Sequence, residues 1–293
     1  PPWKLQFLII DFKGGGLANH LNGMPHLAGV ITNLEETLLE RSLLFIRAEL
    51  KKRQKILAEY GCVHVDEYEK IYRNQIHQRK PMPHLLIVVD EFAELKAKQP
   101  EFMKELISAS RIGRSLGVHL ILATQKPSGQ VSEQIWSNAK FRICLKVQEE
   151  SDSREVLHCA LAAHISEIGR GYFQVGNQEL FFLFQSAYSS EKVREEKEKG
   201  FQIFSVDLGG ERRLLYEKKG EFEKEQTQAE EIRKIIKGQW EKEYKRELCT
   251  VCLEPLKTEI AYPSKGRKEK WKIPVGIYDD PNNQAQPEAV LDL

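Results

Sequence analysis

The chain has 293 residues, of which 41% are hydrophobic and 30% charged. Its 44 lysines and arginines nearly balance 43 aspartates and glutamates, so the net charge is only +1 and the strong positive field of a dedicated nucleic-acid or anionic-membrane binder is absent. No apolar run approaches the roughly 18 residues that span a bilayer. The length allows one α/β domain and a smaller second piece.

The five cysteines are odd in number and mostly far apart, which argues against a secreted disulfide framework and for a reducing cytosol. Cys249 and Cys252 form one CxxC pair, but no second pair follows at the spacing of a zinc ribbon. Pro1 leads into a strand-like run without an initiator Met or a signal peptide. We therefore expect the sequence to begin inside a longer protein.

The first predicted element is a buried parallel strand, Leu5–Ile10, a short run that is apolar except at Gln6 and is followed by Asp11. The glycines at 14–16 then break the pattern. A helix is expected to begin near Thr32 or Asn33, because glutamates follow at the distance of a capping box. Its apolar positions recur at helical spacing and predict one face packed on a sheet: Leu39, Leu43, Ile46 and Leu50.

Two more buried strands are predicted downstream. Leu85–Val89 is apolar and ends in Asp90-Glu91, and His119–Ala123 ends in Thr124-Gln125. A helix that begins at Pro100 and stops near Gly117 connects them. Its inward-facing residues are expected to be Phe102, Met103, Leu106 and Ile107.

The alternation of apolar strands and helices predicts an α/β fold with a parallel sheet covered on both faces. Ligands of such sheets bind beyond the carboxyl ends of the strands. Because Asp11, Asp90 and Gln125 each follow a predicted strand, we expect them to lie at one shared crevice.

The second half of the chain differs in pattern. Phe141–Val147 alternates apolar and polar residues, as a half-exposed strand does, and Gly169–Gln174 and Leu180–Phe184 predict edge strands around a Gly-Asn turn. Glu191–Lys199 and Glu211–Arg246 are dense in both charge signs and predict solvated linker helices.

The Asp90-Glu91 pair after an apolar strand has the arrangement of a Walker B motif. In that arrangement the aspartate holds Mg²⁺ at the phosphates and the next carboxylate orients the attacking water. We assign Asp90 to the metal, through water, and Glu91 to the role of base. The alternative is an exposed acidic strand end without chemistry.

Thr124 and Gln125, at the end of the next strand, are candidates for sensing the γ phosphate; ordinary loop capping is the alternative. Arg111 and Arg114 lie near the end of the preceding helix and are candidate arginine fingers for a neighbouring subunit's nucleotide. Their positive charge also suits the helix dipole without any further role.

A phosphate-binding loop of the form GxxxxGK[ST] is absent from the sequence. The glycines at 14–16 do not supply it and more simply allow a tight turn. The histidines at 20, 26, 158 and 164 are interpreted as chance neighbours rather than metal ligands, given eight histidines in the chain.

Four segments of the chain resemble the FtsK/SpoIIIE family of hexameric motor ATPases, and more closely its type VII secretion branch (EssC/EccC-like proteins). They cover Leu5 to about Ser190: FLIIDFKGGG, LLIVVDEFAELKAKQPEFMKELISASRIGRSLGVHLILATQKPSG, QIWSNAKFRICLKVQEESDSREVL and GRGYFQVGNQELFFLFQSAYS. The resemblance implies a RecA-like P-loop NTPase core with Walker A upstream of Pro1.

The resemblance also implies a domain plan and a cellular setting. Residues 1–208 would be the ATPase domain, 209–270 a charged linker, and 271–293 the start of the next ATPase module, which points to the first module of a tandem series. The parent would be anchored in the bacterial cell membrane, with motor domains on its cytoplasmic face, whereas the fragment itself is expected to be soluble. The parent would bind ATP with Mg²⁺ and form a homo-oligomer, which is a hexamer in this family. Other secretion-system membrane components would be its partners, and small WXG100-type proteins its exported substrates.

Two rival functions remain open. One is a DNA translocase of the same family, which would need a basic DNA-reading module that the sequence does not show. The other is a catalytically silent nucleotide-binding module that regulates its neighbours.

Overall fold

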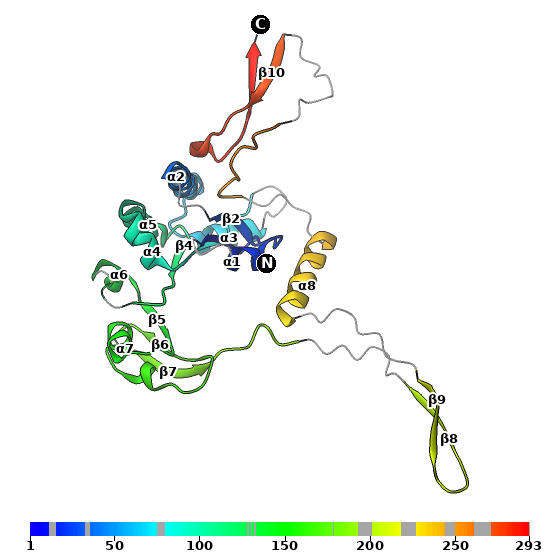
Figure 1. Cartoon of the computed structure of the whole chain (residues 1–293). Coiled ribbons are helices and arrows are strands. Elements are labelled where there is room, and N and C mark those ends of the chain that lie inside the picture. The colour runs from blue at the N-terminus through cyan, green and yellow to red at the C-terminus, as the bar shows by residue number, and fades with distance from the viewer. Residues whose placement is uncertain are drawn as a thin grey trace. The chain divides into compact units, whose positions relative to one another are not determined.

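The computed structural model describes residues 1–11, 16–32, 36–74, 80–127, 129, 131, 133–177, 179–192, 201–217, 227–243, 250–260 and 271–292. The chain divides into two units. Figure 1 labels the helices and strands of both. The first consists of Pro1–Phe184 and Arg246–Leu293, and the second of Gln185–Lys245.

A four-stranded parallel sheet forms the centre of the first unit, with the strand order β2-β1-β3-β4. The strands are β1 (Leu5–Asp11), β2 (Leu27–Ile31), β3 (His84–Asp90) and β4 (Val118–Leu122). β1, β3 and β4 confirm the three predicted strands. β2 was not predicted, because its five residues include Gly29 and give only a short apolar run. Leu8, Ile10, Leu85, Ile87 and Val89, which share one face of the sheet, are almost completely buried. The alternate residues of β3 are only half-buried, so among the described residues the second face is covered less fully than predicted.

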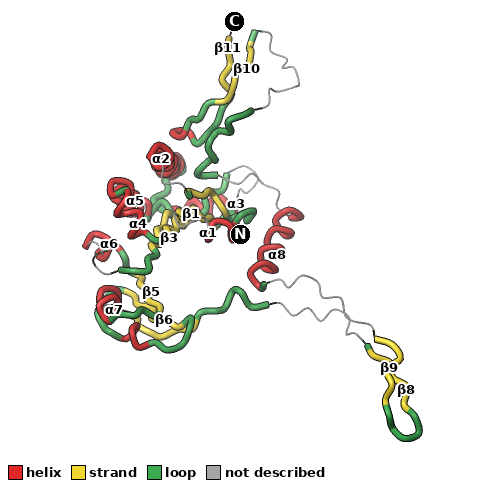
Figure 2. The backbone as a smooth tube through the Cα atoms, in the orientation of Figure 1, coloured by secondary structure: helices red, strands yellow, loops and turns green. Residues whose placement is uncertain are grey.

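Helices pack around this sheet (Figure 2). They are α1 (Gly16–Leu21), α2 (Glu36–Glu59), α3 (Val65–Asn74), α4 (Phe92–Lys98) and α5 (Pro100–Gly113). The predicted apolar stripe of α2 is confirmed: Leu39, Ile46 and Leu50 are buried and Leu43 packs against the same core. The predicted start near Thr32 or Asn33 borders residues 33–35, which lie outside the described part of the chain.

The inward-facing residues expected on α5 are also buried, namely Phe102, Met103, Leu106 and Ile107. The helix ends at Gly113, before the predicted stop at Gly117. Gly117 has a φ of 73° and forms the turn into β4. A Cβ added there would lie 2.8 Å from Val65 Cγ1, so both the backbone conformation and the space favour glycine.

A three-stranded sheet follows, in the order β5-β6-β7. Its strands are β5 (Phe141–Leu145), β6 (Arg170–Val175) and β7 (Leu180–Gln185), flanked by α6 (Glu133–Asn138), α7 (Glu150–Leu157) and the 3₁₀ helix η1 (Leu161–His164). The alternation predicted for β5 is present, but the apolar side chains Phe141, Ile143 and Leu145 are exposed. Cys144, on the opposite face, is buried in a small core with Leu157.

The second unit holds a hairpin of β8 (Gln202–Val206) and β9 (Arg212–Glu217), and α8 (Gln228–Glu243). α8 confirms a helix in the charged segment, but the helix predicted from Glu211 is wrong for residues 212–217, which form β9. The segment forms a strand because a turn precedes it, and the high density of charged residues gave no sign of that turn. Asp207 Oδ1 accepts the N–H groups of Gly209 and Glu211 at 2.9 and 3.0 Å, and Gly210 takes a φ of 85°.

The C-terminal segment of the first unit packs on its core. Val251 and Cys252 are 0% and 7% exposed, and Val251 N–H donates to the Ala28 carbonyl at 2.8 Å. Burial raises the pKa of the Cys252 thiol to about 12, so this cysteine is a packing residue rather than a reactive thiol. Cys249 lies outside the described residues.

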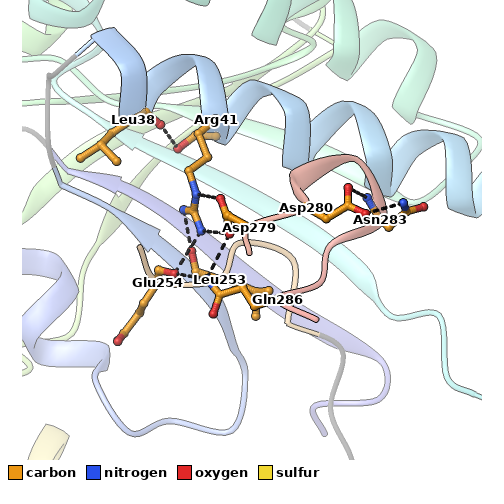
Figure 3. Close-up of polar contacts among 9 residues, drawn as sticks. Leu38, Arg41, Leu253, Glu254, Asp279, Asp280, Asn283 and Gln286 are labelled. Carbon is orange, nitrogen blue, oxygen red and sulfur yellow. Dashed lines mark hydrogen bonds and ion pairs between the residues drawn. The ribbon is translucent and has the colours of Figure 1, made fainter. Parts of the chain in front are cut away.

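Arg41 on α2 holds this segment in place (Figure 3). Its guanidinium forms a two-point ion pair with Asp279, at 2.5 and 3.0 Å, and donates to the carbonyls of Leu253 and Glu254 at 2.8 and 3.0 Å. Asp279 precedes the 3₁₀ helix η2 (Pro281–Asn283) between β10 (Lys272–Ile277) and β11 (Glu288–Asp292). One planar side chain therefore joins a helix, a loop and a hairpin.

We predict that Arg41→Ala loosens this hairpin. Loss of charged hydrogen bonds worth about 1.5–3 kcal/mol each should lower amide-exchange protection around residues 279–286 by at least about tenfold, measured by hydrogen–deuterium exchange. Arg47→Ala is the matched control, since Arg47 on the same helix makes an exposed ion pair with Glu105. Unchanged protection in the Arg41 variant would contradict the assignment.

We predict that low pH also loosens the hairpin, because it protonates Asp279. The Arg41 guanidinium, helped by Gln286, holds the pKa of Asp279 below its usual range. A lowered folded-state pKa contributes stability at pH values above the usual aspartate pKa of about 4, and that stability is lost as the pH falls through the folded-state value.

Candidate functional site

Two carboxylates end neighbouring strands at the carboxyl edge of the parallel sheet. Asp11 of β1 and Asp90 of β3 are directly paired in the strand register. Asp11 is 1% exposed, and its Oδ2 accepts the N–H of Leu17, in the first helix after the strand, at 3.1 Å. Asp90 is half-buried. The Asp11 carboxylate is thus fixed beside the strand end that carries Asp90.

Glu91 follows Asp90 in an unusual backbone conformation. Its φ of 55° and ψ of 59° are in the left-handed region, where a residue with a Cβ pays a conformational cost of about 1–3 kcal/mol. Glu91 is 6% exposed and directly precedes α4. The turn is held by the end of β4, because Ala123 N–H donates to Val89 and Phe92 N–H donates to Ala123, both at 2.9 Å.

The Glu91 carboxylate points to the residues that follow β4. Thr124 Oγ1 donates to Glu91 Oε1 at 2.5 Å, and the Gln125 backbone N–H lies 3.3 and 3.4 Å from the two carboxylate oxygens. The structure therefore brings Asp90, Glu91, Thr124 and Gln125 together, and adds Asp11 beside Asp90. Their chemical roles stay predictions.

Arg111 and Arg114 lie away from this cluster. Both are exposed and sit at the C-terminal end of α5, where the chain turns into the amino end of β4. Gly117 marks that edge, because its N–H donates to the Arg114 carbonyl and its carbonyl accepts from Leu85 N–H near the start of β3. The two arginines thus lie at the opposite edge of the sheet from Glu91 of their own chain. Action on a neighbouring subunit stays a prediction.

The donor set at the carboxyl edge suits magnesium. Mg²⁺ prefers carboxylate oxygens and is usually held by one or two carboxylates together with substrate phosphates and water, and Asp11 and Asp90 supply that chemistry. No group of three or more His, Cys, Asp or Glu side chains within the described ranges forms an all-protein metal site. His158 Nε2 lies 2.8 Å from Arg142 Nη1, and His164 pairs with Glu150 at 3.7 Å.

Asp11 was predicted to share a crevice with Asp90 and Gln125, but no individual role was assigned to it. Its direct pairing with Asp90 depends on the strand order, which no local pattern in the sequence reports. The left-handed conformation of Glu91 could not be predicted from the local sequence either. Glycine, asparagine and aspartate are the residues that usually adopt it, and glutamate is not one of them. Only the structure identifies Thr124 as the partner of Glu91.

The chain is similar to known proteins both in sequence and in fold. A model of the FtsK/SpoIIIE family matches residues 1–129. The ESX secretion system protein EccC of Geobacillus thermodenitrificans is 44% identical over 294 residues, covering 98% of this chain and 20% of that protein. The type VII secretion system protein EssC of Staphylococcus aureus is 55% identical over 188 residues, covering 64% of this chain and 13% of that protein. The chain thus spans about a fifth or less of the length of these relatives.

The chain is similar in fold to a solved structure, the cytoplasmic domain of the Thermomonospora curvata type VII secretion ATPase EccC, with a TM-score of 0.75 and 28% sequence identity. The alignment covers 99% of this chain and 32% of the EccC chain. The predicted α/β fold with a RecA-like P-loop NTPase core is confirmed by this likeness. None of the described helices has the length and apolar content to cross a bilayer. Residues 1–129 belong to the FtsK/SpoIIIE family, and the chain is homologous to the type VII secretion ATPases EccC and EssC.

Proposed function

We propose that this chain is part of an ATP-driven motor module that powers protein export through a type VII secretion system. The observation that carries the proposal is the convergence of Asp11, Asp90 and Glu91 with the end of β4 at one edge of a parallel sheet. Homology to EccC and EssC supplies the type of secretion system. The module would bind and hydrolyse ATP with Mg²⁺ in the intact parent.

Each residue at the edge has a task in this proposal. Asp90, with Asp11 beside it, would hold the metal through water, and Mg²⁺ bound there would supply neutralisation of phosphate charge. Glu91 orients the attacking water and accepts its proton. The Glu91 carboxylate is buried away from bulk solvent. Electrostatic interactions are stronger in such a buried site than in water.

The phosphate-binding loop is missing from the 293 residues, because no GxxxxGK[ST] string occurs. Among the described strands, β4 pairs only with β3, and Ile121 of β4 is 46% exposed. The unpaired N–H and C=O groups of a strand at the edge of a sheet are a ready template for pairing with another strand. We infer that a preceding segment of the parent adds a strand to β4 and brings Walker A to the site.

The setting of the module follows from the same family. We propose a homo-oligomer, a hexamer by analogy, on the cytoplasmic face of the bacterial membrane, with a membrane-anchored parent, other secretion-system components as partners and small WXG100-type proteins as substrates. Nucleic acid is disfavoured as a substrate because the net charge is only +1. A silent regulatory module remains the alternative if turnover is absent.

We predict that the chain of residues 1–293 does not bind Mg-ATP with micromolar affinity, because half of the phosphate pocket is lacking. Isothermal titration calorimetry measures this directly, with a longer piece of the parent that includes Walker A as the positive control. Micromolar or tighter binding by the 293-residue chain would refute the proposed division of the site.

In the intact parent, Glu91→Gln should retain Mg-ATP and lower kcat by at least about 10²-fold, because the amide cannot accept the proton of the attacking water. Steady-state phosphate release and filter retention of labelled ATP measure the two effects. Glu94→Gln, on the first turn of the same helix, is the matched control and should remain close to wild type. Normal turnover of the Glu91 variant removes Glu91 from its role.

A further inference from the structure

We propose that Thr124 is a positioning residue for Glu91 rather than a sensor of the γ phosphate. This inference rests on the proposed function, in which Glu91 is the base. A threonine hydroxyl has one proton to donate. Two acceptors lie near it, Glu91 Oε1 at 2.5 Å and the Lys126 carbonyl at 3.5 Å, and the much shorter distance assigns the proton to Glu91.

The hydroxyl oxygen also accepts one hydrogen bond. Lys126 N–H lies 3.3 Å from Thr124 Oγ1, which accepts it. The side chain is half-buried, and its oxygen is held between the base and its own loop. Contact with a phosphate oxygen would require the same proton and would therefore release Glu91. The geometry thus favours support of the carboxylate over contact with the nucleotide.

Hydrogen bonds from the end of β4 fix the position of the Glu91 carboxylate. Its backbone is in the left-handed region, its side chain is buried, and it makes no side-chain capping bond to α4. The donors from the end of β4, the Thr124 hydroxyl and the Gln125 backbone N–H, help to define where the carboxylate lies. Gln125 contributes through its main chain, so its side chain is not needed for this contact.

Backbone hydrogen bonds hold the segment that carries Thr124. The bonds from Ala123 N–H to Val89 and from Phe92 N–H to Ala123 tie the end of β4 to both sides of the Asp90-Glu91 turn. Thr124 therefore keeps its distance to Glu91 without help from a ligand. A base held in advance by rigid elements avoids the rotational freedom that it would otherwise lose in the transition state.

In the proposed hydrolysis, the water oxygen bonds to the γ phosphorus as the bond between that phosphorus and the β–γ bridging oxygen breaks. One water proton passes to Glu91, and ADP and phosphate leave. The Thr124 proton stays on Thr124 throughout. Its hydrogen bond fixes the rotation of the carboxylate, so that Glu91 faces the water when the nucleotide is in place.

The test uses the intact parent and three variants. Thr124→Val removes the hydroxyl at nearly constant shape and should lower kcat by about 10- to 100-fold, the usual effect of losing a supporting hydrogen bond. The KM and the Kd for Mg-ATP should change by less than about twofold, since the proposal gives Thr124 no part in binding. Thr124→Ser restores the hydroxyl and should recover most of kcat. Gln125→Ala should leave the Glu91 contact in place, because only the main chain makes it.

A double-mutant cycle separates this inference from the function on which it rests. If Glu91→Gln abolishes turnover, adding Thr124→Val should lower kcat no further. Full activity of Glu91→Gln overturns the proposed role of the base. With that role intact, an unchanged kcat in Thr124→Val, or a selective loss of ATP over ADP affinity, overturns only the Thr124 proposal.

One further variant controls for misfolding. Thr124→Ala is the second variant if Thr124→Val loses Mg-ATP binding. Retained binding with a lowered kcat in Thr124→Ala supports the proposal. Loss of binding in both variants, with recovery in Thr124→Ser, assigns the hydroxyl to the nucleotide and overturns it.

Discussion

The placement of β3 between β1 and β4 is the constraint on which the candidate site depends. Parallel pairing with β1 puts Asp11 directly beside Asp90, and pairing with β4 carries Thr124 to Glu91. Each of these residues is ordinary in its local sequence. They come together because three apolar strands end at one edge of the sheet, the edge at which parallel sheets of this class bind ligands.

The same core extends to the C-terminal segment. Gly29 of β2 leaves the space that Cys252 fills, since a Cβ at this glycine would come within 2.8 Å of the Cys252 Cβ. Arg41 then secures Asp279 and the carbonyls of Leu253 and Glu254 to α2. The C-terminal segment is thus part of the packing of the first unit.

Much of the fold could be predicted because its central strands are continuous apolar runs with polar ends. Leu85–Val89 and His119–Ala123 have this pattern, and the catalytic candidates follow them directly. Features that depend on contacts between distant residues could not be predicted. Arg212–Glu217 carries the charges of a linker helix but forms a strand because the turn at Asp207 folds it onto β8. The bond from Thr124 to Glu91 likewise exists only because β3 and β4 are neighbours.

The most direct test of the account is a structure of the parent bound to Mg²⁺ and a non-hydrolysable ATP analogue. The account predicts magnesium and the terminal phosphates at the carboxyl edge of the parallel sheet, with the metal beside Asp90 and the γ phosphate facing Glu91. A nucleotide bound elsewhere on the module, with Asp90 and Glu91 remote from its phosphates, would contradict it.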